Sequence, residues 1–294
     1  MKGTRTTRTR APLALLVSLL AACSNRGVSP RAMPARQASA ATNESISSAP
    51  IASAPTSESS APQPSAVASA DDAKPDDAKP DETPIDQAPV ALEEIAVKGD
   101  KPVLVVRGAS TPIVYLHGRC GDPTAFKAWA SVGRTFGTII SVRGDKKCKG
   151  GGRTQWTEDA RAIDARVSAA ISAVAAETGI ELDQDRRVVV GYSQGSLRAE
   201  ALATRFPDRY PLPVLIAGPR APRDDSLGKA ERVLLMVGER DVREPLEDAA
   251  KRLAKRGRKV RYLELPKARH GEYGPLAEPT MREGLTWLVE GERH

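Results

Sequence analysis

The first 114 residues contain no phenylalanine, tryptophan or tyrosine, and every aromatic side chain lies at or after Tyr115. Aromatic side chains bury large apolar areas and dominate core energetics. Their absence here excludes a core spread evenly over the 294 residues. One folded unit of about 195 residues in the C-terminal part fits this composition better than two domains do.

Cysteine and histidine are also scarce, with three of each. No group of Cys, His and Asp has the spacing of metal ligands. The segment "KGGGR" at 149–153 lacks the Gly-Lys-Ser/Thr ending of a phosphate-binding loop, and we interpret it as an ordinary loop. No stripe of Lys and Arg is interleaved with aromatic residues, which argues against nucleic-acid binding. The sequence thus predicts no cofactor, no metal and no nucleic-acid partner.

Residues 1–22 have the pattern of an export signal. Four basic residues precede the apolar run "APLALLVSLLAA", which is too short to span a bilayer as a stable helix. The run ends in "LAAC", which resembles the lipobox of bacterial lipoproteins. That resemblance implies that the Cys23 thiol is acylated and that Cys23 becomes the new N-terminus. An ordinary cleaved signal with a coincidental cysteine is the alternative. Removal of 1–22 would lower the formal net charge from +7 to +3.

Residues 23–99 are rich in Ala, Ser and Pro and include the acidic repeat "DDAKPDDAKPDE". The segment has no aromatic residue and no sustained apolar period, so it cannot bury enough surface to offset its ordering entropy. We interpret it as a flexible tether that gives a membrane-anchored domain reach through the envelope. A neutral low-complexity spacer is the alternative.

From residue 100 onward, short apolar runs alternate with amphipathic stretches. The apolar runs predict strands over 102–106, 112–118, 137–142, 186–191, 212–218, 231–238 and 259–265. The amphipathic stretches predict helices over 122–132, 157–179, 194–206, 244–257 and 280–290. Strands that alternate with helices predict an α/β fold with a mostly parallel sheet covered on both faces. The short connection over 218–231 leaves little room for a lid domain.

The segment "GYSQG" at 191–195 places Ser193 between two glycines, after a β-branched run and before a helix. A Cβ at Gly191 or Gly195 would crowd such a strand-to-helix turn. Open parallel sheets bind their ligands at the carboxyl ends of strands, where this serine falls. In these features the chain resembles the α/β-hydrolase superfamily over residues 100–294. The resemblance implies a nucleophilic serine followed in the sequence by an acid and then a histidine.

Both further residues are found in the required order. Asp241 follows the predicted strand in "RVLLMVGERD", and His270 follows the last predicted strand in "VRYLELPKARHGEYG". Glu239 is the only plausible substitute for the acid. His294 is the terminal residue and the third histidine belongs to another motif, so the predicted triad is Ser193, Asp241 and His270.

The segment "YLHGRCGD" at 115–122 resembles the His-Gly loop that follows the third strand in such hydrolases. The resemblance implies that the backbone N–H groups of Arg119 and Gln194 form an oxyanion hole, with His117 in a structural role. A fixed pair of donors stabilises charge that develops only in the transition state. We expect the Arg119 guanidinium to point to solvent; contact with an acidic substrate group is the alternative.

The remaining cysteines, Cys120 and Cys148, follow consecutive predicted strands that would lie side by side in this fold. In an oxidising envelope a disulfide between them is the expected state. Two free thiols are the alternative.

Together, these features predict a lipid-anchored serine hydrolase of the bacterial cell envelope, periplasmic or surface-facing. We expect a carboxylesterase-type reaction through an acyl-enzyme on Ser193. The expected partners are a small-molecule or lipid-like ester and the membrane through the anchor, with no obligate protein partner evident. The same triad would serve a serine peptidase or acyltransferase. A catalytically silent envelope binding protein is the alternative from another class.

Overall fold

The computed structural model describes residues 90–291. The predicted signal segment, Cys23, most of the predicted tether and His294 lie outside the described residues. No helix among the described residues is long and apolar enough to cross a membrane.

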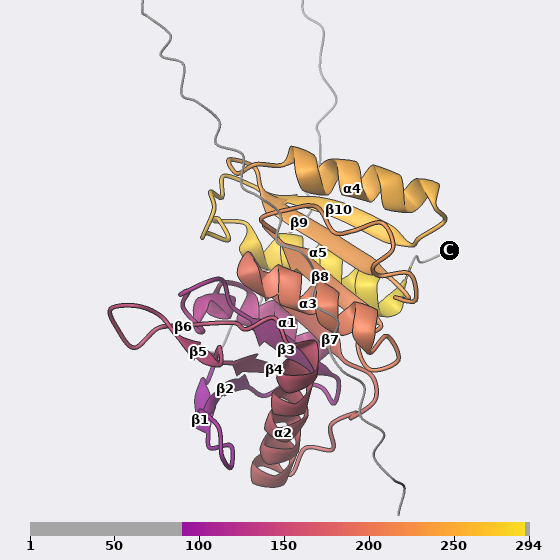
Figure 1. Cartoon of the computed structure of the whole chain (residues 1–294). Coiled ribbons are helices and arrows are strands. Elements are labelled where there is room, and N and C mark those ends of the chain that lie inside the picture. The colour runs from indigo at the N-terminus through magenta and orange to yellow at the C-terminus, as the bar shows by residue number, and fades with distance from the viewer. Residues whose placement is uncertain (1–89, 292–294) are drawn as a thin grey trace, which may run out of the picture. The chain divides into compact units, whose positions relative to one another are not determined.

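Short β-branched runs form the strands of the central sheet, and amphipathic stretches form the helices between them (Figure 1). The strands of this sheet are β1 (Glu93–Ile95), β2 (Val103–Val106), β3 (Pro112–Leu116), β4 (Thr138–Val142), β7 (Val188–Tyr192), β8 (Leu212–Ile216), β9 (Val233–Gly238) and β10 (Val260–Leu265). A small separate ribbon pairs β5 (Lys146–Lys147) with β6 (Thr154–Gln155). The helices are the 3-10 helix η1 (Ala125–Trp129), α1 (Ala130–Phe136), α2 (Ala160–Thr178), α3 (Gln194–Arg205), α4 (Glu244–Lys255) and α5 (Ala277–Glu290).

The eight strands are ordered β1-β2-β4-β3-β7-β8-β9-β10. The two pairings that involve β2 are antiparallel, and all the others are parallel. Every residue of β3, β4, β7, β8 and β9 is buried. Such continuous apolar strands are typical of a parallel sheet covered on both faces. The structure therefore confirms the predicted mostly parallel sheet.

Two layers of helices cover this sheet (Figure 1). One core cluster joins the sheet to α2, α3 and α4, and the other joins its opposite face to α1 and α5. The connection from β8 to β9 contains no helix or strand among the described residues. No large lid domain is therefore evident, in agreement with the sequence.

Helix α2 illustrates how local sequence fixes an element. The Asp159 side chain accepts hydrogen bonds from the N–H groups of Arg161 and Ala162 and so caps the N-terminus. Gly179 adopts φ 70° and ends the helix in the left-handed conformation, for which glycine has no steric penalty. The predicted end of this helix at 179 is therefore confirmed to within one residue.

The folded chain begins earlier than the predicted boundary at residue 100. Glu93–Ile95 forms β1, which pairs antiparallel with β2 at the edge of the sheet. Ile95 and Val97 are buried in the core. The prediction that the tether extends to residue 99 is therefore wrong for these positions. Their apolar side chains are too few to show a period, but the neighbouring strand supplies the partner surface that orders them.

Candidate active site

Three of the predicted site residues lie just beyond the carboxyl ends of parallel strands. Ser193 follows β7 directly, Asp241 follows β9, and His270 follows β10. Strands β7, β8, β9 and β10 are consecutive neighbours in the sheet, so their carboxyl ends form one edge, where open parallel sheets bind ligands. The fold thus brings together Ser193 and His270, which are 77 positions apart in the chain.

His270 lies between the other two side chains. Its Nδ1 is 2.8 Å from Oδ2 of Asp241, and its Nε2 is 3.2 Å from Oγ of Ser193. An ionised carboxylate can only accept a hydrogen bond, so this contact assigns the ring proton to Nδ1. Nε2 is then free to accept the serine hydroxyl proton. The Asp241 side chain is 11% exposed and that of His270 is 51% exposed, so the carboxylate is shielded while the ring faces solvent.

Glu239, the other acid considered, has a different partner. Its Oε2 accepts a hydrogen bond from the backbone N–H of Lys267 at 2.6 Å. The backbone N–H of Arg240 donates to the carbonyl oxygen of Ala268 at 2.9 Å. These contacts tie the loop after β9 to the loop after β10, which holds the carboxylate and the imidazole in register.

Ser193 occupies a strained turn between strand and helix. Its φ is 50° and its ψ is −115°, and non-glycine residues rarely adopt a positive φ. A Cβ at Gly195 would lie 1.9 Å from the carbonyl oxygen of Leu116, and one at Gly191 would lie 2.3 Å from the carbonyl oxygen of Gly195. Both approaches are far inside van der Waals contact. This confirms the steric reason given for the two glycines.

The loop after β3 passes directly beside the serine. A Cβ at Gly118 would lie 3.4 Å from Cβ of Ser193. The next residue, Arg119, is exposed and lines a pocket that also contains Ser193. Gln194 is the first residue of α3, and the first N–H groups of a helix have no intrahelical acceptor. The two predicted oxyanion donors therefore belong to the two segments that meet at Ser193.

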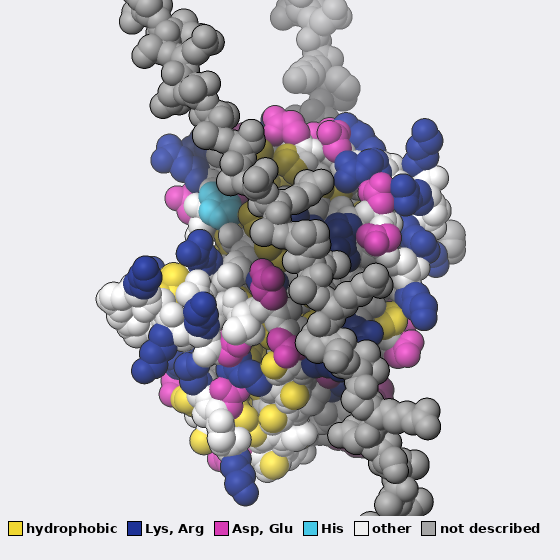
Figure 2. Space-filling view, viewed as in Figure 1, with side chains coloured by type: hydrophobic (Ala, Val, Ile, Leu, Met, Phe, Trp, Pro, Cys, Tyr) yellow, Lys and Arg dark blue, Asp and Glu magenta, His cyan; other side chains and the backbone are white. Residues whose placement is uncertain are grey.

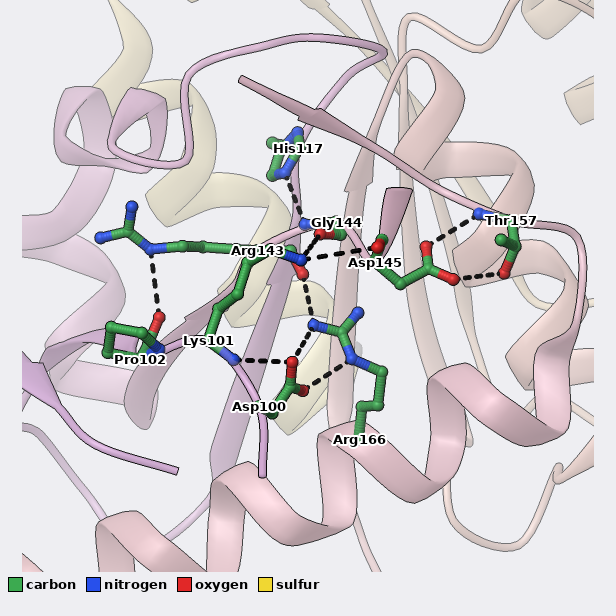
Figure 3. A network of polar contacts seen from close by, with 9 residues as sticks. All are labelled: Asp100, Lys101, Pro102, His117, Arg143, Gly144, Asp145, Thr157 and Arg166. Carbon is green, nitrogen blue, oxygen red and sulfur yellow. Dashed lines mark hydrogen bonds and ion pairs between the residues drawn. The ribbon is translucent and has the colours of Figure 1, made fainter. Parts of the chain in front are cut away.

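His117 is fully buried, and its ring contacts Gly118, Thr154 and Gly144 rather than the triad residues. The backbone N–H of Gly144 donates to its Nε2 at 3.0 Å, so Nδ1 carries the proton and contacts the carbonyl oxygen of Gly118 at 2.7 Å. Figure 3 shows the His117 ring above Gly144. Burial lowers the pKa of His117, which favours the neutral ring. The ring thus links the loop after β3 to the loop after β4.

Two side-chain contacts at the site were not predicted from the sequence. The hydroxyl of Tyr192 accepts a hydrogen bond from the N–H of Gly271 at 2.7 Å and so holds the histidine loop. Burial raises the pKa of Tyr192 to about 12. The side-chain oxygen of Gln194 accepts the backbone N–H of Trp156 at 3.1 Å. Both residues flank the nucleophile in the sequence, but only tertiary structure reveals what their side chains touch.

A pocket of about 190 Å³ opens at Ser193 and His270. Three tyrosines form much of its wall: Tyr115, Tyr192 and Tyr273. The hydroxyl of Tyr273 donates to that of Tyr115 at 3.3 Å, and this contact is buried. Burial raises the pKa of both hydroxyls far above the usual range. The tyrosine part of the wall is therefore aromatic and uncharged, and Arg119 and Asp122 also line the pocket.

The structure contains the predicted disulfide between Cys120 and Cys148, with their Cα atoms 6.0 Å apart. It joins the loop after β3 to the β5–β6 ribbon. The strands before these two loops, β3 and β4, are paired in parallel, as the sequence prediction required. Among residues 90–291 there is no group of three or more His, Cys, Asp or Glu side chains that could hold a metal ion.

The chain matches no family model, and no curated protein sequence matches it. Solved structures do resemble it. Dienelactone hydrolase from Anabaena variabilis is 17% identical with a TM-score of 0.50, and the match covers 70% of this chain and all of that one. A carboxylesterase from Mesorhizobium loti (19% identity, TM-score 0.49) is covered over 99% of its length by 66% of this chain. A carboxylesterase from Bacillus cereus is 19% identical with a TM-score of 0.47, and the match covers 66% of this chain and 95% of that one.

At such low identity the likeness defines the fold alone. The sheet order, the two helical layers and the match to the dienelactone hydrolase structure together define an α/β-hydrolase fold. Function must then be argued from the site, because one fold carries many activities.

Proposed function

We propose that the protein is a serine hydrolase that cleaves carboxylic esters through an acyl-enzyme on Ser193. The observation that carries this proposal is the position of His270, which contacts both Ser193 Oγ and the Asp241 carboxylate. A nucleophile in hydrogen-bond reach of a base that a third group orients is the arrangement of an activated serine.

The reaction proceeds in two halves. Nε2 of His270 takes the hydroxyl proton as Ser193 Oγ attacks the ester carbonyl, and Asp241 stabilises the imidazolium that results. The imidazolium then gives that proton to the departing alcohol, which leaves an acyl group on Oγ. A water molecule, deprotonated by His270, then attacks the acyl carbonyl; the bond to Oγ breaks, the carboxylic acid leaves, and the imidazolium returns its proton to Oγ.

The tetrahedral intermediates of both halves carry a negative charge on the former carbonyl oxygen. The N–H groups of Arg119 and Gln194 are the proposed donors to that oxygen. Support comes from the close approach of Gly118 to Ser193 and from the start of α3 at Gln194. The contact between the Gln194 side chain and the Trp156 N–H further restrains one donor.

The dimensions of the pocket favour a small acyl group. Its volume of about 190 Å³ is below the roughly 300–1,000 Å³ typical of sites that enclose drug-sized ligands. The tyrosine wall suits an apolar acyl chain, whereas the exposed side of His270 suits an alcohol that leaves toward solvent.

The location of the protein is a separate proposal that rests on the sequence. Acylation of Cys23 would anchor the chain to a membrane of the bacterial envelope, since two or three acyl chains suffice for stable anchoring. The residues that carry this proposal lie outside the described part of the chain, so its support is the "LAAC" segment.

The test of the proposed function compares two acids that are close in sequence. Asp241→Asn removes the carboxylate that orients His270, and we expect kcat for p-nitrophenyl butyrate to fall about 10⁴-fold. Glu239→Gln, the matched control, removes a charge but keeps a side-chain oxygen that can accept the Lys267 N–H, so the contact between the two loops is preserved and turnover should stay within about three-fold. Ser193→Ala should lose the activity. Equal effects of the two acid variants, or no ester turnover by the wild type, would contradict the proposal.

A further inference from the structure

A second and larger pocket adjoins the one that contains Ser193. Its volume is about 570 Å³. Both pockets are lined by Gly121 and Asp122, so they lie on two sides of the same turn. The loop of the β5–β6 ribbon forms another wall, through Lys147 and residues 151–154.

This second pocket is strongly cationic. Four basic side chains line it, Lys101, Arg143, Lys147 and Arg153, against the single carboxylate of Asp122. Figure 2 shows Lys and Arg side chains gathered around the projecting β5–β6 ribbon. A concave surface with one sign of charge focuses its field into the space it encloses.

On the inner wall, Lys101 and Arg143 are held by different kinds of partner. Nζ of Lys101 donates to the carbonyl oxygens of Gly144 at 2.9 Å and Asp145 at 3.5 Å, as Figure 3 shows. These acceptors orient the ammonium group but carry no net charge. Arg143 differs, because it forms an ion pair of 2.7 Å with Glu94.

On the outer wall, Arg153 and Lys147 form fewer contacts. Arg153 donates to the carbonyl oxygen of Cys120 at 3.4 Å, a long and neutral contact. Among residues 90–291, Lys147 has no ion pair. The Asp122 carboxylate accepts both the N–H and the hydroxyl of Thr124 at 2.7 Å. This carboxylate keeps its negative charge and attracts Arg153, but one acid among four basic side chains leaves the pocket cationic.

Covalent and backbone bonds fix this cationic wall relative to the serine. The disulfide joins Cys148, next to Lys147, to Cys120 in the loop beside Ser193. The N–H of Cys148 donates to the carbonyl oxygen of Arg153 at 3.1 Å and closes the ribbon. The charges are therefore held near the reacting centre, which distinguishes them from scattered surface lysines.

We propose that this cationic pocket binds an anionic group, a carboxylate or a phosphate, that belongs to the same molecule as the scissile ester. The proposal rests on the proposed function and narrows its substrate class to esters that carry a negative charge. The charge contributes to binding and to orientation, while the ester reacts in the tyrosine-lined pocket.

The connection between the two pockets sets how far the anion lies from the ester. A Cβ at Gly118 would be in van der Waals contact with Ser193, and the N–H of Gly121 donates to the Gly118 carbonyl at 2.9 Å. Such a turn spans less than about 7 Å, so the cationic pocket begins on the order of 10 Å from Oγ. At roughly 1.3 Å per bond along an extended chain, the charge belongs about seven or eight bonds from the carbonyl carbon.

The experiment uses pairs of esters that differ only in charge. The first pair is the mono-p-nitrophenyl ester of suberic acid and its methyl ester, with the charge on the acyl side. The second pair is 3-(4-butyryloxyphenyl)propanoate and its methyl amide, with the charge on the alcohol side. In one of the pairs, at 20 mM salt, we expect kcat/KM of the anionic ester to exceed that of its neutral partner by about five-fold or more. Screening at 0.5 M salt should remove most of this preference.

Two adjacent lysines provide a matched comparison. Side chains of successive strand residues point to opposite faces, and of the β5 pair only Lys147 lines the pocket. Lys147→Glu should lower kcat/KM for the preferred anionic ester about ten-fold and leave its neutral partner within two-fold. Lys146→Glu makes the same change in net charge and should lower the anionic value about two-fold or less.

The outcomes separate this proposal from the proposed function. Equal kcat/KM within both pairs, or equal losses in the two lysine variants, would overturn the anionic subsite even if Ser193-dependent turnover of the neutral esters is normal. Absence of turnover for all four esters, with Ser193→Ala indistinguishable from wild type, would instead overturn the hydrolase itself and this proposal with it.

Discussion

Replacement of both disulfide cysteines, Cys120→Ala with Cys148→Ala, should change stability and chemistry together. The bond closes a loop over a sequence separation of 28. The chain-entropy relation for a loop of this size gives a stability loss of about 3.5 kcal/mol. That loss is a large share of the roughly 5–15 kcal/mol by which a domain is stable.

The chemical effect follows from where the bond is attached. Cys120 is adjacent to Arg119, a proposed oxyanion donor, and has a φ of 52° that the surrounding loop must hold. Removal of one donor costs about 2.7–4 kcal/mol in kcat. The turn from Gly118 to Gly121 and the contact of His117 with Gly118 remain after the bond is lost. We therefore expect a partial effect, a fall in kcat of about 5- to 100-fold with KM changed less than about three-fold.

The assay measures urea unfolding and steady-state ester hydrolysis on the same preparations. Leu253→Ala is the control, because it removes a buried side chain of α4 and should cost a comparable 2–5 kcal/mol without touching the site. Its kcat should stay within about two-fold of wild type. A double-alanine variant that loses stability but retains full kcat would refute the link between the disulfide and the oxyanion loop.

Three further predictions concern the strand-to-helix turn at Ser193, the buried His117 and the anchor at Cys23. Gly195→Ala places a Cβ 1.9 Å from the Leu116 carbonyl oxygen and should destabilise by about 3 kcal/mol or more in urea, whereas Gly151→Ala, with nothing within 4 Å, should change stability by less than about 0.5 kcal/mol. Because burial lowers the pKa of His117, the unfolded chain binds a proton below about pH 6.5 that the folded chain does not; stability is therefore lost as pH falls from there, and His117→Asn should reduce that slope by up to about 1.4 kcal/mol per pH unit. A slope that the variant leaves unchanged would contradict this assignment. Wild-type protein expressed in a bacterial host should partition into Triton X-114 and Cys23→Ser should not; wild type found only in the aqueous phase would exclude the anchor.

The sequence was sufficient to predict much of the fold because its apolar runs are short and well separated. Strands such as 188–192 read as buried β-branched runs, and their helices carry clear end signals such as Gly179. The edge strand at 93–95 was missed because three residues show no period. Helix α5 begins at Ala277, before the predicted 280, since Pro279 is compatible with a first helical turn.

Some features of the candidate site could also be predicted from the sequence, and others could not. The resemblance to α/β-hydrolases was sufficient to predict that Ser193, Asp241 and His270 come together, and the structure places them in hydrogen-bond contact. The contacts of Tyr192 with the histidine loop and the cationic pocket beside the site were not predictable. Each depends on distances between segments far apart in the sequence, which periodicity and spacing do not encode.

The most direct test of the central claim is covalent labelling with a fluorophosphonate probe, read by intact mass and peptide mapping. The account predicts one adduct per chain, on Ser193, with labelling slowed by about 10³-fold or more in a His270→Ala variant that folds normally. Asp241→Asn should slow labelling as well. Absence of an adduct, an adduct on another residue, or a labelling rate that does not depend on His270 would contradict the assignment of Ser193 as an activated nucleophile.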